Sequence, residues 1–104
     1  MATRRIELPN GNIEYRNEFG ELHNHKGWAK ETSNGSKESY VNGQLHSIGD
    51  NPAIVTPLGG YRTYYKYGKL HRDEDKPAYI VNGIRRWYKD GIQHTPSNPK
   101  YDYR

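Results

Sequence analysis

Four histidines recur along the 104-residue chain at nearly even spacing and are the first candidates for chemistry. They are His23, His46, His71 and His94, which lie 23, 25 and 23 residues apart. A metal centre needs several ligands about 2 Å from one ion, whereas equivalent positions of neighbouring hairpins lie roughly 5 to 10 Å apart. We therefore favour histidines that lock the repeat by hydrogen-bonding the backbone of the segment that bridges successive units, in their own or the next unit. We predict no metal and no cofactor.

The densest group of carboxylates lies in the run RDEDK, at Asp73, Glu74 and Asp75. A run that is polar throughout is typical of a solvated loop. The serines lie in no G-x-S-x-G motif, and no G-x-x-x-x-G-K-[ST] loop is present to hold a phosphate. The chain also has no cysteine to act as a nucleophile. We expect no enzymatic activity.

Basic and aromatic residues are concentrated in the second half of the chain. Residues 60–104 have ten Lys and Arg against five Asp and Glu, while residues 1–59 have six against seven. Eight of the ten tyrosines also lie in residues 60–104. Because side chains alternate between the two faces of a strand, two trios should share one face of the predicted sheet. The trios are Arg62, Tyr64 and Lys66, and Arg85, Trp87 and Lys89.

This basic and aromatic face has three interpretations. Cations interleaved with aromatic rings bind single-stranded nucleic acid, through phosphate contacts and base stacking. The same residue types suit an acidic protein partner, because Tyr, Trp and Arg are frequent hot-spot residues. In the third interpretation the rings pack in the core of the sheet. The apolar stems of Lys and Arg then cover the rings, while their charged groups stay in water.

The elements that position these residues come from an internal repeat. The segments YVNGQLH, YKYGKLH and YKDGIQH begin at Tyr40, Tyr65 and Tyr88 and end at His46, His71 and His94. We expect these six residues to be the structural positions of the repeat. An earlier, looser copy is YRNEFGELH, at residues 15–23, which we align with two extra residues. Two copies continue alike, as HSIGDNPA and HRDEDKPA, and each of these segments should bridge to the next unit.

Each unit also contains a second turn signal between runs of β-branched and aromatic residues. These signals are Asn10-Gly11, Asn34-Gly35, Gly59-Gly60 and Asn82-Gly83. They predict tight type I′ hairpin turns, in which both central residues have positive φ. Since an isolated hairpin is marginal in water, the units should share one sheet. We predict an all-β, elongated meander of about four hairpins in one domain, residues 1–94, followed by a C-terminal tail, residues 95–104.

The pattern Y-x-x-G-x-L-H, in units of about 23 residues, resembles the MORN-repeat family. It is especially similar to the divergent repeats spelled NGKLHRxDGPA in phage and large-virus proteins. The resemblance extends from Ile6 to His94. It implies roles in interaction and scaffolding, sometimes with dimerisation, and no chemistry.

Composition favours a folded, water-soluble chain. Hydrophobic residues make up 32% and the net charge is only +4, while regularly placed tyrosines can pack and keep their hydroxyls hydrated. No apolar run reaches the roughly 20 residues of a membrane span, and the N-terminal segment lacks the apolar region of a secretory signal. We expect a cytoplasmic protein without a membrane partner.

These observations predict a non-catalytic binding module that holds an acidic protein through the basic and aromatic face. The resemblance implies a small phage-encoded effector that inhibits a host protein, for example a component of host defence, in the host cytoplasm. One alternative is a nucleic-acid or nucleotide-binding protein that uses the same face. Another is a structural or oligomerising module, because edge strands at both ends of an open sheet invite homodimerisation.

Overall fold

Every regular element is a β-strand, as the β-branched and aromatic runs predict. The computed structural model describes residues 3–96. None of those residues forms a helix of the length and apolar character needed to cross a bilayer. The strands are β1 (Arg4–Glu7), β2 (Ile13–Arg16), β3 (Lys30–Glu31), β4 (Lys37–Glu38), β5 (Tyr40–Val41), β6 (Gln44–Leu45), β7 (Ile54–Val55), β8 (Tyr61–Thr63), β9 (Tyr65–Lys66), β10 (Lys69–Leu70), β11 (Tyr79–Val81), β12 (Ile84–Lys89) and β13 (Ile92–His94).

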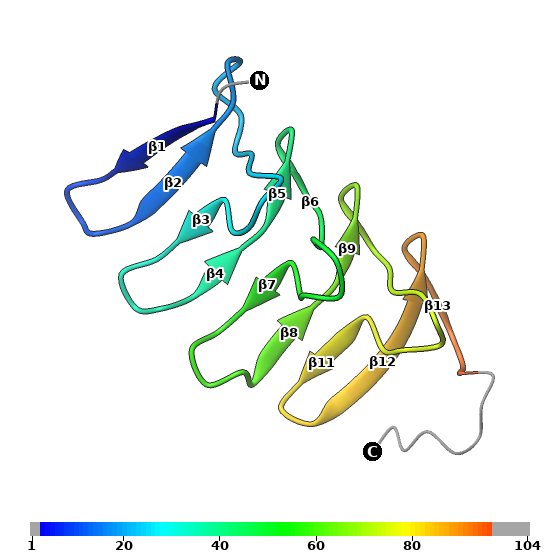
Figure 1. The fold of residues 1–104 in the computed structure, drawn as a ribbon. Helices are drawn as coiled ribbons and strands as arrows, with labels where there is room; N and C mark the ends of the chain where they lie inside the picture. Colours follow the sequence, from blue (N-terminus) through cyan, green and yellow to red (C-terminus); the bar gives the residue numbers. More distant parts are fainter. Residues whose placement is uncertain (1–2, 97–104) are drawn as a thin grey trace.

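The strands form an elongated antiparallel array. Nine of them pair in the order β1-β2-β3-β4-β7-β8-β11-β12-β13, while β5-β6 and β9-β10 are two-stranded ladders at hairpin tips. The array extends 46 × 27 × 17 Å, with the four units side by side (Figure 1). The predicted all-β meander of hairpins is therefore confirmed. The predicted tail, residues 95–104, lies outside the described residues from position 97 onward.

Each unit has one turn at either end of its strands (Figure 1). We call the turn that precedes the histidine the tip turn. In the second, third and fourth units the tip turns are Asn42-Gly43, Tyr67-Gly68 and Asp90-Gly91, and all six residues have positive φ. Two consecutive residues of this kind define the type I′ hairpin. The Gly of the repeated pattern is therefore a turn requirement.

The turns at the opposite end differ from the prediction in three of four units. Only Asn82-Gly83 has positive φ at both residues. In the first unit Leu8 N–H donates to Asn12 O at 2.8 Å and Gly11 N–H donates to Leu8 O at 3.0 Å. This is a three-residue loop in which Gly11 alone has positive φ. Type I′ geometry is wrong there, and also in the second unit, where Thr32, Ser36 and Gly35 form the same loop, because a three-residue loop needs positive φ only at its last residue.

The first unit also aligns differently with the others. The backbone N–H of His23 donates to Tyr15 O, as that of His46 does to Ser39 O and that of His71 to Tyr64 O. Tyr15 is thus equivalent to Ser39 and Tyr64, and Arg16 takes the position of the repeat tyrosine. The tip of the first unit has one extra residue, so the expected alignment with two extra residues is wrong.

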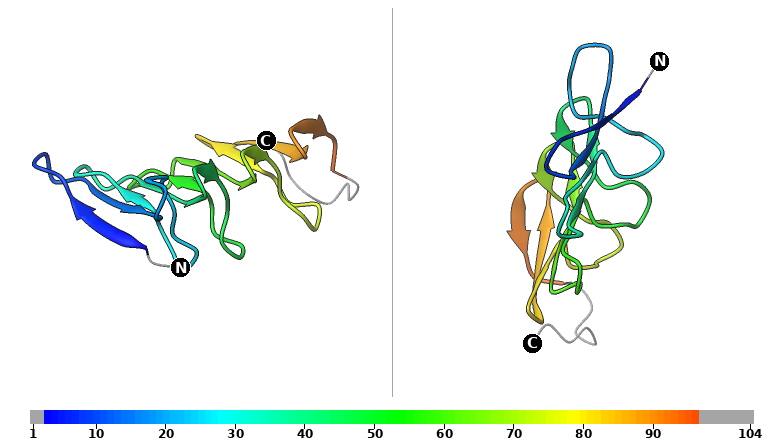
Figure 2. Two further views of the ribbon diagram at one scale, coloured as in Figure 1. Left: turned by 90° about the horizontal axis from the view of Figure 1, so that it is seen from above. Right: turned by 90° about the vertical axis from the view of Figure 1, so that its left-hand side faces the viewer.

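The core lies between the sheet and the segments that bridge successive units. Figure 2 shows these bridges on one side of the array. Each bridge ends in a fully buried alanine, at Ala29, Ala53 and Ala78. The largest cluster of buried side chains comprises Tyr64, Ala78 and Ile80, with Tyr88 packed against it. One face of the sheet is therefore largely covered.

Candidate functional site

The two aromatic rings at the centre of the predicted binding face belong to the core. Tyr64 is 5% exposed and Trp87 is 3% exposed. The Arg72 guanidinium lies 3.7 Å from the centroid of the Tyr64 ring, and Trp87 Nε1–H donates to Asp75 O at 2.9 Å. The bridge at residues 71–78 thus covers both rings. The expectation that they form exposed platforms is wrong, because residue alternation alone could not show which face the bridges cover.

The cations of the same two trios have different environments. Lys66, Arg85 and Lys89 are exposed, and Arg62 is half-buried. Arg62 and Arg85 both pair in register with Ile80, so the three side chains form one row across the covered face. The structure therefore agrees with the interpretation in which cations frame a packed aromatic core. A role of these cations in partner binding stays a prediction.

The repeat tyrosines are half-buried in the hairpin tips. Tyr40 lies opposite Leu45, and Tyr65 opposite Leu70. The Tyr40 hydroxyl donates to a Glu38 carboxylate oxygen at 2.9 Å. Burial, followed by the effect of Glu38, raises the pKa of Tyr40 to about 12. Burial also raises the pKa of Tyr65. These hydroxyls remain protonated at neutral pH, which fits a packing role for the predicted structural positions, including Tyr88.

The repeat histidines connect each unit to the next. The Nδ1 atom of His23 accepts the N–H of Asn42 at 2.9 Å, and that of His46 accepts the N–H of Tyr67 at 3.1 Å. His71 Nδ1 likewise accepts the N–H of the first tip-turn residue of the fourth unit, at 3.0 Å. These three histidines bond the backbone of the next unit, but the predicted partner, the bridge backbone, is wrong. Their partner is the tip turn of the next unit.

Two further backbone hydrogen bonds accompany each histidine contact. The N–H of the tip-turn glycine donates to the leucine carbonyl of the preceding unit, at 2.8 Å in all three cases. The residue after the histidine donates its N–H to the carbonyl of the next repeat tyrosine. We call this set of three contacts the unit lock. The backbone pairs are Gly43 with Leu22, Gly68 with Leu45, Gly91 with Leu70, Asn24 with Tyr40, Ser47 with Tyr65, and Arg72 with Tyr88.

His71 uses both ring nitrogens in hydrogen bonds within the array. Its Nε2 atom lies 2.8 Å from Asp73 Oδ1, and Nδ1 accepts the Asp90 N–H. Nε2 must therefore carry the hydrogen. This hydrogen bond is the main reason why the pKa of Asp73 is lowered. Within residues 3–96 no group of three or more His, Asp or Glu side chains is arranged to hold a metal ion.

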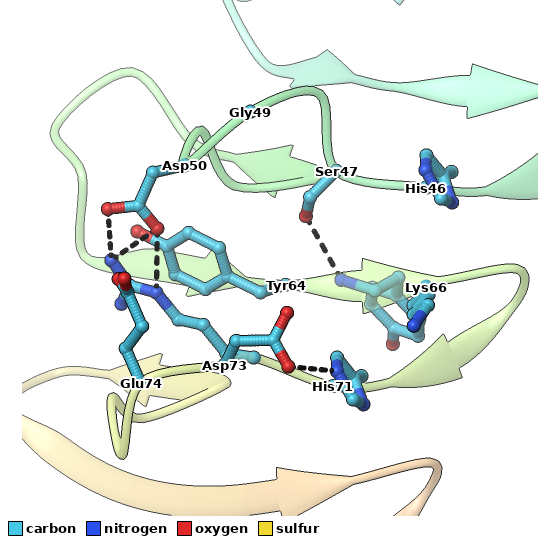
Figure 3. A pocket seen from close by; sticks show the side chains of 11 residues that line it. His46, Ser47, Gly49, Asp50, Tyr64, Lys66, His71, Asp73 and Glu74 are labelled. Carbon is cyan, nitrogen blue, oxygen red and sulfur yellow. Dashed lines mark hydrogen bonds and ion pairs between the residues drawn. The ribbon is translucent and has the colours of Figure 1, made fainter.

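A groove of about 410 Å³ lies between the bridges of the second and third units (Figure 3). Its walls come from His46–Asp50 on one side and His71–Glu74 on the other, with Tyr64 at the base. The Asp50 carboxylate bonds the Arg72 guanidinium at 3.1 and 3.2 Å. These ion pairs join the two bridges, so the groove is closed at one end by a charged clasp.

The carboxylate of the clasp is held in its charged form. Asp50 Oδ2 lies 3.1 Å from Lys76 Nζ, and Lys76 also lies 3.3 Å from Glu74. The hydrogen bond from Lys76, and then the Arg72 guanidinium, lower the pKa of Asp50 against the opposing effect of burial. Because each charge has a protein partner, an ionic ligand would have to break these pairs to enter. The clasp therefore stabilises the junction of the two units.

The exposed apolar side chains lie beside turns, and the sequence reasoning missed them. Large apolar residues next to a turn glycine would have been the signal, because such positions are usually polar. These residues and their exposures are Phe19 (75%), Leu58 (98%), Tyr67 (58%), Ile84 (52%) and Ile92 (72%). Four of the five, Leu58, Tyr67, Ile84 and Ile92, belong to the last two units, which also have the excess of cations.

No protein-family model, no curated protein and no solved structure matches this chain.

Proposed function

We propose that the chain is a non-catalytic binding module of MORN-like repeats, which docks an acidic protein through the last two units. The observation that supports this proposal is the composition of their exposed surface. Exposed cations and exposed apolar side chains both occur on these two units, a combination that provides charge steering and desolvated contact in protein interfaces. The residues are Lys66, Tyr67, Lys69, Ile84, Arg85, Arg86, Lys89 and Ile92.

The burial of Tyr64 and Trp87 favours a protein partner over single-stranded nucleic acid. Base stacking on exposed rings contributes about 1–3 kcal/mol per base to such binding. With both rings under the bridge, a nucleic acid could stack on Tyr67, which is 58% exposed, but not on Tyr64 or Trp87, and would otherwise contact this surface through its phosphates. Exposed Ile84 and Ile92 offer nothing to phosphates, whereas apolar side chains suit a protein interface.

We propose further, on the resemblance to repeats of phage proteins, that the partner is a host protein that the module inhibits in the host cytoplasm. The alternative of a purely structural module has support in the unit locks, which use the repeat histidines entirely within the array. That alternative requires no soluble partner. The two proposals therefore differ in whether the surface cations are needed to bind a partner protein.

A pull-down from bacterial lysate separates these functions. The bait is compared with a variant in which Lys66, Arg85, Arg86 and Lys89 are changed to Glu, with and without nuclease. A matched control changes the exposed cations Arg4, Arg5 and Lys26 of the first unit to Glu. Circular dichroism and thermal unfolding verify that each bait is folded.

We expect one captured protein that survives nuclease and depends on the C-terminal cations only. Loss of all captured material on nuclease treatment would support the nucleic-acid alternative. Identical capture by all three baits would contradict docking through the basic surface and support the structural alternative.

A further inference from the structure

The fourth unit ends with the same set of groups that the first three units use to hold their successors. At this position it has the Gln93 carbonyl, the His94 imidazole and the Thr95 N–H. In the three preceding units the corresponding groups bind a tip turn through the unit lock. Within residues 3–96 no further tip turn follows β13. The interface that joins the units is thus repeated once more, without an occupant among these residues.

The imidazole of His94 differs from the three engaged histidines. Its Nδ1 atom lies 2.9 Å from the carbonyl oxygen of Thr95. A carbonyl oxygen has no hydrogen to donate, so His94 Nδ1 must carry the hydrogen. The Nδ1 atoms of His23, His46 and His71 instead accept a backbone N–H. His94 would therefore have to exchange its tautomer to hold a turn as the others do.

The residue that would contact the glycine of an incoming turn is also different. In the first three units a polar side chain, Glu21, Gln44 or Lys69, lies 3.6–3.7 Å from the Cβ position of the next tip-turn glycine. The fourth unit has Ile92 here, and Ile92 is 72% exposed. Ile92 and His94 also border a groove of about 640 Å³ between the fourth unit and the bridge before it, which is otherwise lined by Arg72, Glu74, Asp75, Lys89 and Asp90. An apolar contact is therefore available at the centre of the open end.

A second copy of the chain has no free tip turn to offer, and its type I′ turn at Asn82-Gly83 is also engaged, because the Asn82 N–H donates to Gly60 O at 2.7 Å. In the first unit, Asn17 Oδ1 accepts the N–H groups of Phe19 at 2.9 Å and Glu21 at 3.0 Å. The carbonyl of Asn17 accepts the Gly20 N–H at 3.0 Å. The N–H groups of Phe19, Gly20 and Glu21 are thus used within their own unit, and the other three tip turns are bound by preceding units. Among residues 3–96, the lock groups of the fourth unit hold no tip turn.

We propose that the open end at Ile92–Thr95 docks a β-hairpin of a partner protein, with a type I′ turn whose second residue is glycine. The first turn residue donates its N–H to His94 Nδ1, and the glycine donates to the Gln93 carbonyl and lies over Ile92. Binding extends the array by strand addition, a common mode of recognition. The proposal rests on the proposed function only in requiring a protein partner, since it needs no acidic surface.

The test uses the full chain and a small hairpin as the probe. The probe is a peptide with the sequence of Trp87–His94 and one added cysteine at each end, closed by the disulfide between them; it has one Lys and one Asp. A control peptide carries valine in place of its glycine, because valine is strained at the positive φ of that turn position. ¹⁵N-labelled chain is titrated with each peptide, and amide and imidazole signals are followed by NMR.

We expect the glycine peptide alone to shift the amide signals of Ile92, Gln93 and Thr95, and to move the hydrogen of the His94 ring from Nδ1 to Nε2. His94→Ala should weaken binding about tenfold, as expected for loss of one hydrogen bond worth about 1.4 kcal/mol. His25→Ala, at an exposed histidine of the first bridge, should leave binding unchanged.

Four results would overturn the proposal. They are equal responses to both peptides, no response at Ile92–Thr95, self-association in sedimentation experiments that His94→Ala abolishes, and a large gain in peptide affinity on removal of residues 97–104. The third result would identify a second copy as the occupant, and the fourth would identify the chain's own C-terminal segment. Because the peptide carries balanced charges, failure here is distinguishable from failure of the lysate experiment, which depends on surface cations.

Discussion

The first and third junctions of the array share their backbone contacts and differ in what fills them. His23 and His71 hold the next tip turn at 2.9 and 3.0 Å, respectively. Beneath the first junction lies Ser39, next to a cavity of about 70 Å³ that Trp28 also lines. At the third junction Trp87 fills the equivalent position and is 3% exposed. The unit lock is thus common to the junctions. The residue that packs beneath each junction, which we call the filling residue, determines how much apolar surface each unit buries.

The largest effect should come from removing the filling residue of the fourth unit. Trp87→Ala deletes a buried ring and its hydrogen bond to Asp75, and large-to-small changes of this kind cost about 3–5 kcal/mol. Ser39→Ala at the equivalent position should be neutral or slightly stabilising, because the Ser39 hydroxyl is buried without a hydrogen-bond partner. Urea unfolding followed by circular dichroism measures both. Equal destabilisation by the two changes would show that filling does not distinguish the units.

A smaller effect is expected from removing one histidine from a unit lock. His71→Ala leaves the Asp90 N–H without its acceptor in a buried site, at a cost of about 1–3 kcal/mol. His71→Asn should recover part of that loss, since the Asn Oδ1 atom can replace Nδ1 as the acceptor. His94→Ala should change the free energy of unfolding by less than about 0.5 kcal/mol, because within residues 3–96 His94 bonds only its neighbour Thr95. Equal costs at His71 and His94 would contradict the unit lock.

The sequence predicted the parts of this comparison that depend on local signals. Asn42-Gly43 and the equally spaced histidines indicated tip turns and locks, because both features require particular residue types at fixed positions. The side chain that packs under each junction could not be predicted, because its burial depends on which face of the sheet the bridges cover. Bridge segments such as HRDEDKPA have no periodicity from which that face could be identified. Alternation placed Tyr64 and Trp87 together on one face but could not tell a covered face from an open one. The first unit was misaligned because its tip has an insertion.

The tip-turn glycines should be nearly as sensitive as the histidines. Gly68 has φ +84, a conformation that costs other residues roughly 1–2 kcal/mol. Gly68→Ala should therefore lower the free energy of unfolding by about that amount. Its Cβ would meet only ordinary contacts, the nearest being Gln44 Nε2 at 3.7 Å, so backbone strain is the cause. Gly27→Ala is the control, because Gly27 lacks a positive φ and has open space around its Cβ position. A tolerated Gly68→Ala would contradict a strict type I′ turn.

The smallest effect should be a pH dependence at the second junction. Burial, followed by the nearby charge of Lys66, lowers the pKa of His46 below its usual 6.5. The folded chain therefore favours the neutral ring, which accepts the Tyr67 N–H. The stability from this contact is fully present above pH 6.5 and is lost as the pH falls from 6.5 through the lowered pKa of the folded state. His46→Asn keeps an acceptor that does not titrate, so the free energy of unfolding should fall less steeply between about pH 6.5 and 5 than in the unchanged chain. His25→Asn, at an exposed position of the first bridge, should keep the original slope. If both substitutions flatten the slope equally, the pH dependence comes from histidines in general, and the tip turn of the third unit is not held by a neutral His46.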